Sequence, residues 1–76
     1  MNYLDILERD GWHCQLCGLA ISKVVKYPDP MSASLDHILP LTAGGHHIAA
    51  NLQAAHMGCN AAKSNRPAGD QLRMIA

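Results

Sequence analysis

Apolar residues follow two different spacings along this chain, and each spacing predicts a different kind of element. Near the start, Tyr3, Leu4 and Leu7 are separated by steps of three and four, which predicts a short helix over residues 3–10. Gly11 follows as a turn residue that ends it. A helix this short is marginal by itself, so we expect it to form only by packing on the rest of the chain.

Strict alternation over residues 33–39 predicts the first strand of a small sheet. One face of this strand carries Leu35, His37 and Leu39, and the other carries Asp36 and Ile38. The two polar neighbours, Asp36 and His37, are therefore expected on opposite faces. Only a twisted strand end or a bulge would bring them to the same side.

The second half of the chain predicts a loop, a strand and a helix in that order. The glycine pair at 44–45 favours a loop over residues 42–47, and residues 51–55 predict the second strand. Residues 56–66 predict a helix that Pro67 ends, and residues 69–76 form a tail to which we assign no structure. The run at 19–27 is apolar with two lysines and can include a half-exposed strand. The mixture predicts an α+β fold.

The length of 76 residues predicts one domain over residues 1–76, with a core at about 9–66 and a tail at 67–76. A chain of about this size buries only roughly 60 % of its unfolded surface. Phenylalanine is absent and aromatic residues are 4 % of the chain, so the bulky rings that fill most small cores are scarce. Such a chain commonly needs a disulfide or a metal ion for stability.

The three cysteines favour a metal. They cannot all pair with one another, and nothing in the chain is typical of a secretory signal or a transmembrane span. Cys14-x-x-Cys17 and His56-x-x-Cys59 have the spacing of two halves of a zinc knuckle, which predicts a structural Cys₃His zinc site. A redox pair at Cys14 and Cys17 is disfavoured because no βαβ pattern accompanies it. His13 remains an alternative fourth ligand.

The formal net charge is zero, which does not suggest a nucleic-acid ligand. Its distribution is uneven, however. Residues 1–43 carry three basic and five acidic groups, whereas residues 44–76 carry Lys63, Arg66 and Arg73 against Asp70. A bound divalent ion would add positive charge where a phosphate approaches. We therefore expect nucleic acid to bind weakly without metal.

Three motifs in one order resemble a known family. They are Leu35-Asp36-His37-Ile38-Leu39-Pro40, then Asn51-Leu52-Gln53, then His56-x-x-Cys59-Asn60-x-x-Lys63. Together with the Cys14-x-x-Cys17 pair they resemble the HNH endonucleases over about residues 9–66. That resemblance implies a ββα-metal fold, similar to treble-clef folds, that a zinc ion stabilises. It also implies an enzyme that hydrolyses DNA phosphodiester bonds. Many members of this family have cysteine where this chain has His56.

The resemblance also implies roles for individual residues. Asp36 and Asn60 would hold a catalytic divalent ion such as Mg²⁺ or Mn²⁺, because hard cations prefer oxygen ligands. His37 would be the general base, a task that suits an imidazole with an ordinary pKa of about 6.5. Asn51 would tie the loop between the strands and help to orient His37. Lys63 and Arg66 are expected as phosphate contacts, and no role is assigned to the remaining histidines: His13, His46 and His47.

Two other functions compete with a nuclease. One is a zinc-dependent nucleic-acid-binding module with a vestigial nuclease site, although binding alone requires neither Asp36 nor His37. The other is a zinc deaminase, which would need a His-x-Glu motif before its cysteines, whereas Glu8 precedes every histidine here. The expected partner is double-stranded DNA cut with little sequence specificity, and the expected location is the cytoplasm of a bacterium or phage-infected cell. By analogy with small phage and actinobacterial HNH proteins, phage packaging proteins are a possible targeting partner; no membrane partner is expected.

Overall fold

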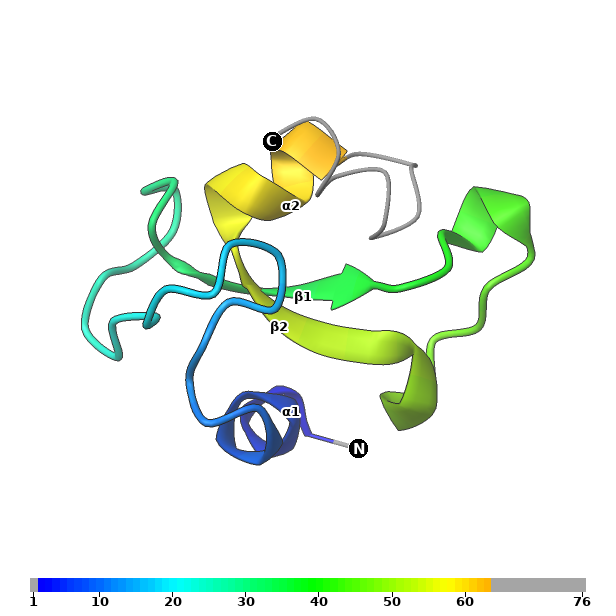
Figure 1. Ribbon diagram of the computed structural model, residues 1–76, viewed down its shortest axis with the longest axis horizontal. Coiled ribbons are helices and arrows are strands. Elements are labelled where there is room, and N and C mark those ends of the chain that lie inside the picture. Colours follow the sequence, from blue (N-terminus) through cyan, green and yellow to red (C-terminus); the bar gives the residue numbers. More distant parts are fainter. Residues whose placement is uncertain (1, 64–76) are drawn as a thin grey trace.

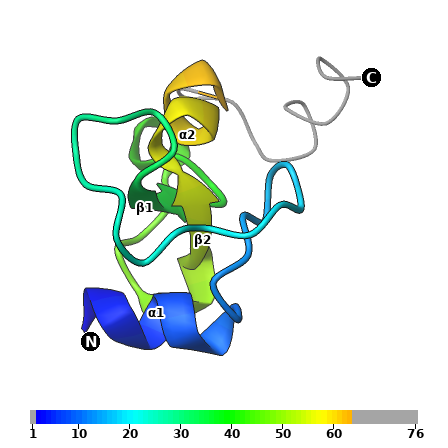
Figure 2. The same cartoon turned by 90° about the vertical axis from the view of Figure 1, so that its left-hand side faces the viewer.

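A two-stranded antiparallel hairpin lies between two short helices in the computed structural model, which describes residues 2–63 (Figure 1). In chain order the elements are α1 (Tyr3–Arg9), β1 (Ala33–His37), β2 (Leu52–His56) and α2 (Met57–Lys63). Two short 3₁₀ helices, Leu41–Ala43 and Ala49–Asn51, lie in the connection between the strands. Helix α1 packs on the β2 side of the hairpin and α2 on the β1 side, as both views show (Figures 1 and 2). The α+β class is confirmed.

The hairpin register is continuous. Ala33 pairs with His56 at one end and His37 with Leu52 at the other, and Asp36 stands opposite Gln53. No bulge interrupts this ladder within the described strands, so Asp36 and His37 keep the alternation of an ordinary strand. Strand β1 ends at His37, two residues earlier than predicted, and β2 begins and ends one residue later than predicted.

Hydrogen bonds join the C-terminal end of helix α1 to β2 and to the 3₁₀ helix that precedes it. The Asn2 side chain caps it by accepting a hydrogen bond from the Leu4 N–H at 3.0 Å. At the other end, the Arg9 guanidinium donates to the carbonyls of Ala49 and Leu52, at 2.9 and 2.5 Å. The Asp10 carboxylate accepts from the Ala54 N–H at 2.8 Å. Helix α1 thus forms by packing and tethering, as its marginal length predicts.

The core is small and consists of aliphatic side chains and one cysteine. Leu7 from α1, Leu16 and Ile21 from the following segment, and Ala54 and Ala55 from β2 pack around Cys14. Two alanines at the centre leave little apolar volume per residue, so the area that burial can stabilise is limited. This packing is consistent with the expectation that the small core needs a metal ion or a disulfide for stability.

Residues 19–27, which the sequence indicated can include a strand, contain none of the named strands. The residue pair His13 and Ala20 makes one isolated bridge, and the chain then bends away through exposed positions. Beyond it, the carbonyls of Pro30 and Ser32 accept from the Gly58 and Met57 N–H groups, each at 2.8 Å. These bonds satisfy two of the free donors at the start of α2. Helix α2 starts at Met57 rather than His56; its predicted end at Arg66 and the tail lie outside the described residues.

Candidate functional site

Four predicted metal ligands come together where three segments meet. Cys14 and Cys17 lie in the turn after α1, His56 is the last residue of β2, and Cys59 lies in the first turn of α2. Their ligand atoms all lie within 4.8 Å of one another. The His56 Nδ1 is 3.4 Å from the Cys17 sulfur and 4.0 Å from the Cys59 sulfur. Tetrahedral zinc bound to S and N would separate neighbouring donors by about 3.5–3.8 Å. This Cys₃His cluster suggests a zinc site.

The His56 ring is oriented for this task. Its Nε2 lies 3.1 Å from the Ala20 carbonyl, which can only accept, so Nε2 carries the proton and the unprotonated Nδ1 faces the sulfurs. Metal-bound histidines usually donate their second N–H in this way, which fixes the tautomer. His13, the alternative fourth ligand, instead lies against its own turn, with Nδ1 2.8 Å from the Gly11 carbonyl.

The thiols of the cluster differ in pKa because of burial and neighbouring charge. Burial acts to raise the pKa of Cys14, but hydrogen bonds from the backbone N–H groups of His56, Cys17 and Leu16 outweigh it and lower the pKa to about 7. Burial, and then the negative charge of Cys14, raises the pKa of Cys59 to about 12. Neighbouring thiolates therefore repel one another, and a divalent cation would relieve that repulsion.

The Asp36 carboxylate is buried and already paired. Its side chain is 1 % exposed; one oxygen lies 2.9 Å from the Lys63 ammonium and the other accepts from the Gln53 amide at 2.8 Å. Lys63, also 1 % exposed, donates in addition to the His37 carbonyl at 2.8 Å. A carboxylate and an amide oxygen suit a hard divalent ion, but an ammonium stands beside the carboxylate in this arrangement. Lys63 therefore contacts Asp36 here rather than facing outward as a phosphate contact, and Arg66 lies outside the described residues.

Asn60 holds α2 against β1. Its amide nitrogen donates to the Ser34 hydroxyl and to the Leu35 carbonyl, each at 2.9 Å. Because both amide hydrogens are used, the side-chain oxygen is the atom that remains for a cation. Asn60 and Lys63 are three positions apart and share one helix face. That face therefore brings an amide and an ammonium to the same strand of the hairpin.

His37 contacts a histidine to which the sequence assigned no role. Its Nε2 lies 2.9 Å from the Nδ1 of His47, and the two rings are tilted with centroids 5.2 Å apart. His37 is partly exposed and His47 is exposed, so both face solvent at the end of β1. The sequence signal that could have indicated this contact is the position of His47 in the connection between the strands. An antiparallel hairpin folds that connection back toward His37 at the end of β1.

Asn51 ties that loop at both ends. Its side chain exchanges two hydrogen bonds with the Leu39 backbone, each 2.9 Å, and donates to the His46 carbonyl at 2.9 Å. Gly45 passes so close that a Cβ there would collide with the Leu39 carbonyl and the Asn51 amide. These contacts fix the backbone that carries His46 and His47. Whether they also orient His37 in catalysis stays a prediction.

The family model for HNH endonucleases matches residues 14–66. This segment includes the Cys₃His cluster, both strands and α2, and covers well over half of the chain, so the protein belongs to the HNH endonuclease family. A search of curated proteins found no match to the chain. Among the described residues, no helix has the length and apolar character needed to cross a bilayer.

Proposed function

We propose that this protein is a metal-dependent DNA endonuclease that hydrolyses phosphodiester bonds with His37 as general base. The observation that carries the proposal is the meeting of β1 with α2. It sets Asp36 and Asn60 on facing elements. His37 is the next residue of the strand, and a twist at the end of β1 would be needed to bring its ring to the side of Asp36. A binding module would need none of these three groups at this junction. The substrate is double-stranded DNA, and the cytoplasmic location and packaging partner stay predictions from the resemblance.

Asp36 and the side-chain oxygen of Asn60 would hold the divalent ion, which would supply charge neutralisation at the phosphate. Binding requires Lys63 to leave the Asp36 carboxylate, because the ammonium now stands 2.9 Å from that oxygen. Once released, the Lys63 ammonium can pair with a phosphate oxygen instead. The Lys63 side chain would then have two conformations: one paired with Asp36, as observed, and one paired with a phosphate, as predicted.

His37 would accept the proton of the attacking water. When the His37 Nε2–H donates to the His47 Nδ1, the His37 Nδ1 is unprotonated and can act as the base. His47 thereby holds the tautomer that general-base catalysis needs. The water attacks phosphorus directly, the 3′ or 5′ oxygen leaves with a proton from solvent, and no covalent intermediate forms.

Supercoiled plasmid tests the activity. Wild-type protein is expected to nick or linearise it only with added Mg²⁺ or Mn²⁺. The His37→Ala variant should be about 10² to 10⁴-fold slower in single turnover, equivalent to roughly 3–5 kcal/mol of barrier. His46→Ala, in the same loop, is the matched control and should cut at the wild-type rate. A folded, zinc-loaded His37→Ala protein that cuts at the wild-type rate would refute His37 as the base.

The second candidate is a zinc-dependent nucleic-acid-binding module, and the buried Asp36–Lys63 pair favours it because that pair leaves the carboxylate without an open coordination position. It predicts DNA binding without cleavage under any divalent ion. Asn60→Ala distinguishes the two: it should abolish cleavage in a nuclease, whereas in a binding module it would change only stability.

A further inference from the structure

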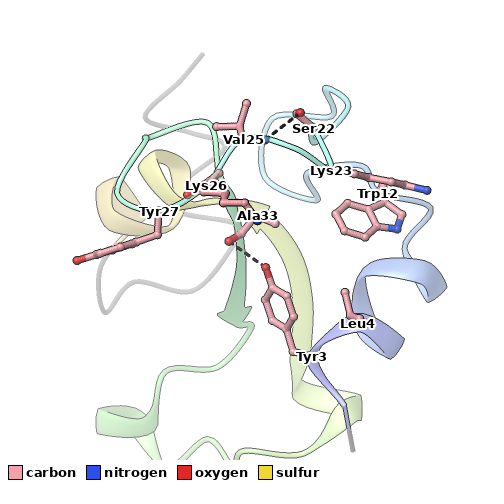
Figure 3. Close-up of a pocket in the computed structure, with 10 residues that line it drawn as sticks. Tyr3, Leu4, Trp12, Ser22, Lys23, Val25, Lys26, Tyr27 and Ala33 are labelled. Atoms are coloured by element: carbon pink, nitrogen blue, oxygen red, sulfur yellow. Dashed lines mark hydrogen bonds between the residues drawn. The ribbon is translucent and has the colours of Figure 1, made fainter.

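A hollow of about 310 Å³ lies at the opposite end of β1 from His37, between α1 and the segment that precedes β1. Its lining includes Tyr3 from α1, Trp12 from the turn after it, and Lys23, Lys26 and Ser32 from the long connection. Figure 3 shows the Tyr3 and Trp12 rings reaching it from different elements, with Lys26 on one side and Lys23 on the other. We call it the Tyr3–Trp12 hollow. Its volume is at the lower end of the roughly 300–1,000 Å³ of ligand pockets.

Two residues that line this hollow each have a buried polar atom without a hydrogen-bond partner. Within residues 2–63, the Trp12 Nε1 and the Ser32 Oγ are the buried side-chain nitrogen and oxygen atoms without a hydrogen bond, and both residues line the hollow. Ser32 is 2 % exposed, and its backbone is fixed by bonds to Asp29 and Met57. An unsatisfied buried group carries a desolvation cost that a ligand with acceptors would remove. Both atoms can donate.

The charge of the lining is entirely positive. Lys23 and Lys26 are exposed, and no carboxylate lines the hollow. The Lys23 ammonium lies 5.1 Å from the centre of the Trp12 ring, so a cation and an aromatic face are presented together. The Tyr3 hydroxyl is already bonded to the Ala33 carbonyl at 3.2 Å, which fixes its ring at the edge of the hollow. Tyr27 also lines the hollow, on the side away from Trp12 (Figure 3).

We propose that the Tyr3–Trp12 hollow binds one nucleotide of a DNA strand, an inference that rests on the proposed function and adds a second substrate contact to it. Aromatic rings with adjacent cations are the combination that binds nucleotides, because every base has a stacking face and every phosphate a negative charge. The base of this nucleotide must be unpaired from its complement, since a paired base is stacked inside the duplex. The unpaired base lies against Trp12, the phosphate pairs with Lys23 and Lys26, and Ser32 and the indole N–H donate to oxygen or nitrogen acceptors of the nucleotide.

The position agrees with a strand that reaches both sites. The hollow adjoins Ala33 at one end of β1 and His37 lies at the other end. A strand of this length spans roughly 13 Å, which is about four base steps of duplex DNA. A substrate lying along the hairpin could therefore contact the hollow and present a phosphodiester near His37. The hollow would fix the register of a substrate whose cleavage site is otherwise unspecified.

Trp12, the single tryptophan of the chain, gives a direct test. Zinc-loaded protein is titrated with a short oligonucleotide in buffer free of added divalent ions, so that no cleavage occurs. Binding should quench the Trp12 fluorescence, whereas a mononucleotide should bind far more weakly. For a single-stranded oligonucleotide, the double variant Lys23→Gln, Lys26→Gln should weaken binding about tenfold and reduce the salt slope by about 1.4, as expected for two lost phosphate contacts. Equal binding of the variant would overturn the proposal, as would a wild-type protein that binds mononucleotide but no oligonucleotide.

Ser32→Ala separates a ligand contact from a packing role. Removing an unpartnered buried hydroxyl should leave the melting temperature unchanged or higher, yet weaken oligonucleotide binding several-fold. Val24→Ala, in the same connection but outside the hollow, is the matched control and should change neither. If Ser32→Ala binds as well as wild type, the hollow is not the site. Cleavage of plasmid in Mg²⁺ is scored separately: cutting with unaffected binding refutes only the hollow, and hollow-dependent binding without cutting refutes only the nuclease.

Discussion

The Cys₃His cluster and the Asp36 carboxylate are two predicted cation positions in one small domain, and their surroundings are opposite. Around the cluster, four donors converge from three segments, and the one histidine is oriented by a bond on its far side. Around Asp36, both oxygens are satisfied by Lys63 and Gln53. The cluster therefore presents converging donors of the kind that bind a cation, whereas the carboxylate already has a cationic partner in the chain itself.

The difference follows from what each position does for the fold. The cluster links the N-terminal turn to the start of α2 beside a small core, so a zinc ion bound there would contribute folding free energy. The Asp36–Lys63 pair links α2 to β1 without any ion. A site for an exchangeable ion would compete with that link. We expect the first position to be required for folding and the second to be regulated by competition.

The largest effect is expected at the cluster. His56→Ala should lose zinc and cooperative folding, because structural zinc contributes roughly 10 kcal/mol in finger peptides. His13→Ala, next to Cys14 but outside the cluster, should keep both. Elemental analysis and circular dichroism of the two variants would test this. A folded, zinc-loaded His56→Ala protein would mean that the fourth ligand has been misassigned.

Asp36→Asn is expected to cost about 3–5 kcal/mol of stability, because it leaves the Lys63 ammonium buried without its counter-charge. The double variant Asp36→Asn, Lys63→Met should recover much of that loss. Denaturant unfolding of the zinc-loaded proteins would measure both. If the single and double variants unfold alike, the buried pair is not what joins α2 to β1.

Lys63→Met should tighten Mn²⁺ binding about tenfold, equivalent to about 1.4 kcal/mol, since the ion no longer competes with an ammonium for Asp36. Lys23→Met removes the same charge from an exposed position and is the control. Free Mn²⁺ is counted by electron paramagnetic resonance on zinc-loaded protein without DNA. Unchanged or weaker binding in Lys63→Met would show that Lys63 does not block this position.

The smallest effect concerns Asp10, a carboxylate with a cationic partner nearer the surface. Burial acts to raise the pKa of Asp10, but hydrogen bonds from Arg9 and from the Ala54 N–H outweigh it and lower the pKa. Its contribution is therefore complete above the unfolded pKa of about 3.9 and is lost as pH falls through the lower folded value. Asp10→Asn should cost only about 0.5–1 kcal/mol, constant between about pH 5 and 8. Melting curves across that pH range would measure this loss of stability. A loss as large as that expected for Asp36→Asn would contradict the difference that we draw between the carboxylate nearer the surface and the buried one.

The sequence predicted the elements and ligands that depend on local spacing. The Cys14–Cys17 and His56–Cys59 pairs, each with two intervening residues, and an alternating strand can be predicted without tertiary information, and the Cys₃His set is assembled as expected. The partner of Asp36 was not readable, because it depends on how α2 is rotated against β1. The contact between His37 and His47 was missed for a similar reason, since only the folded loop sets two residues ten positions apart side by side. Residues 19–27 form no strand because their alternation is weak, and they make only the isolated bridge between His13 and Ala20.

The tethering of α1 to β2 has a practical consequence for anyone shortening or fusing this protein. The family match begins at Cys14, so a truncation drawn at that boundary would discard Arg9 and Asp10. With them go the bonds to the Ala49 and Leu52 carbonyls and to the Ala54 N–H, which flank Asn51 on both sides. A tag joined at residue 13 would yield a chain that keeps all four residues of the Cys₃His cluster, but whose connection between the strands has lost its anchor. Fusion partners are better placed before Asn2.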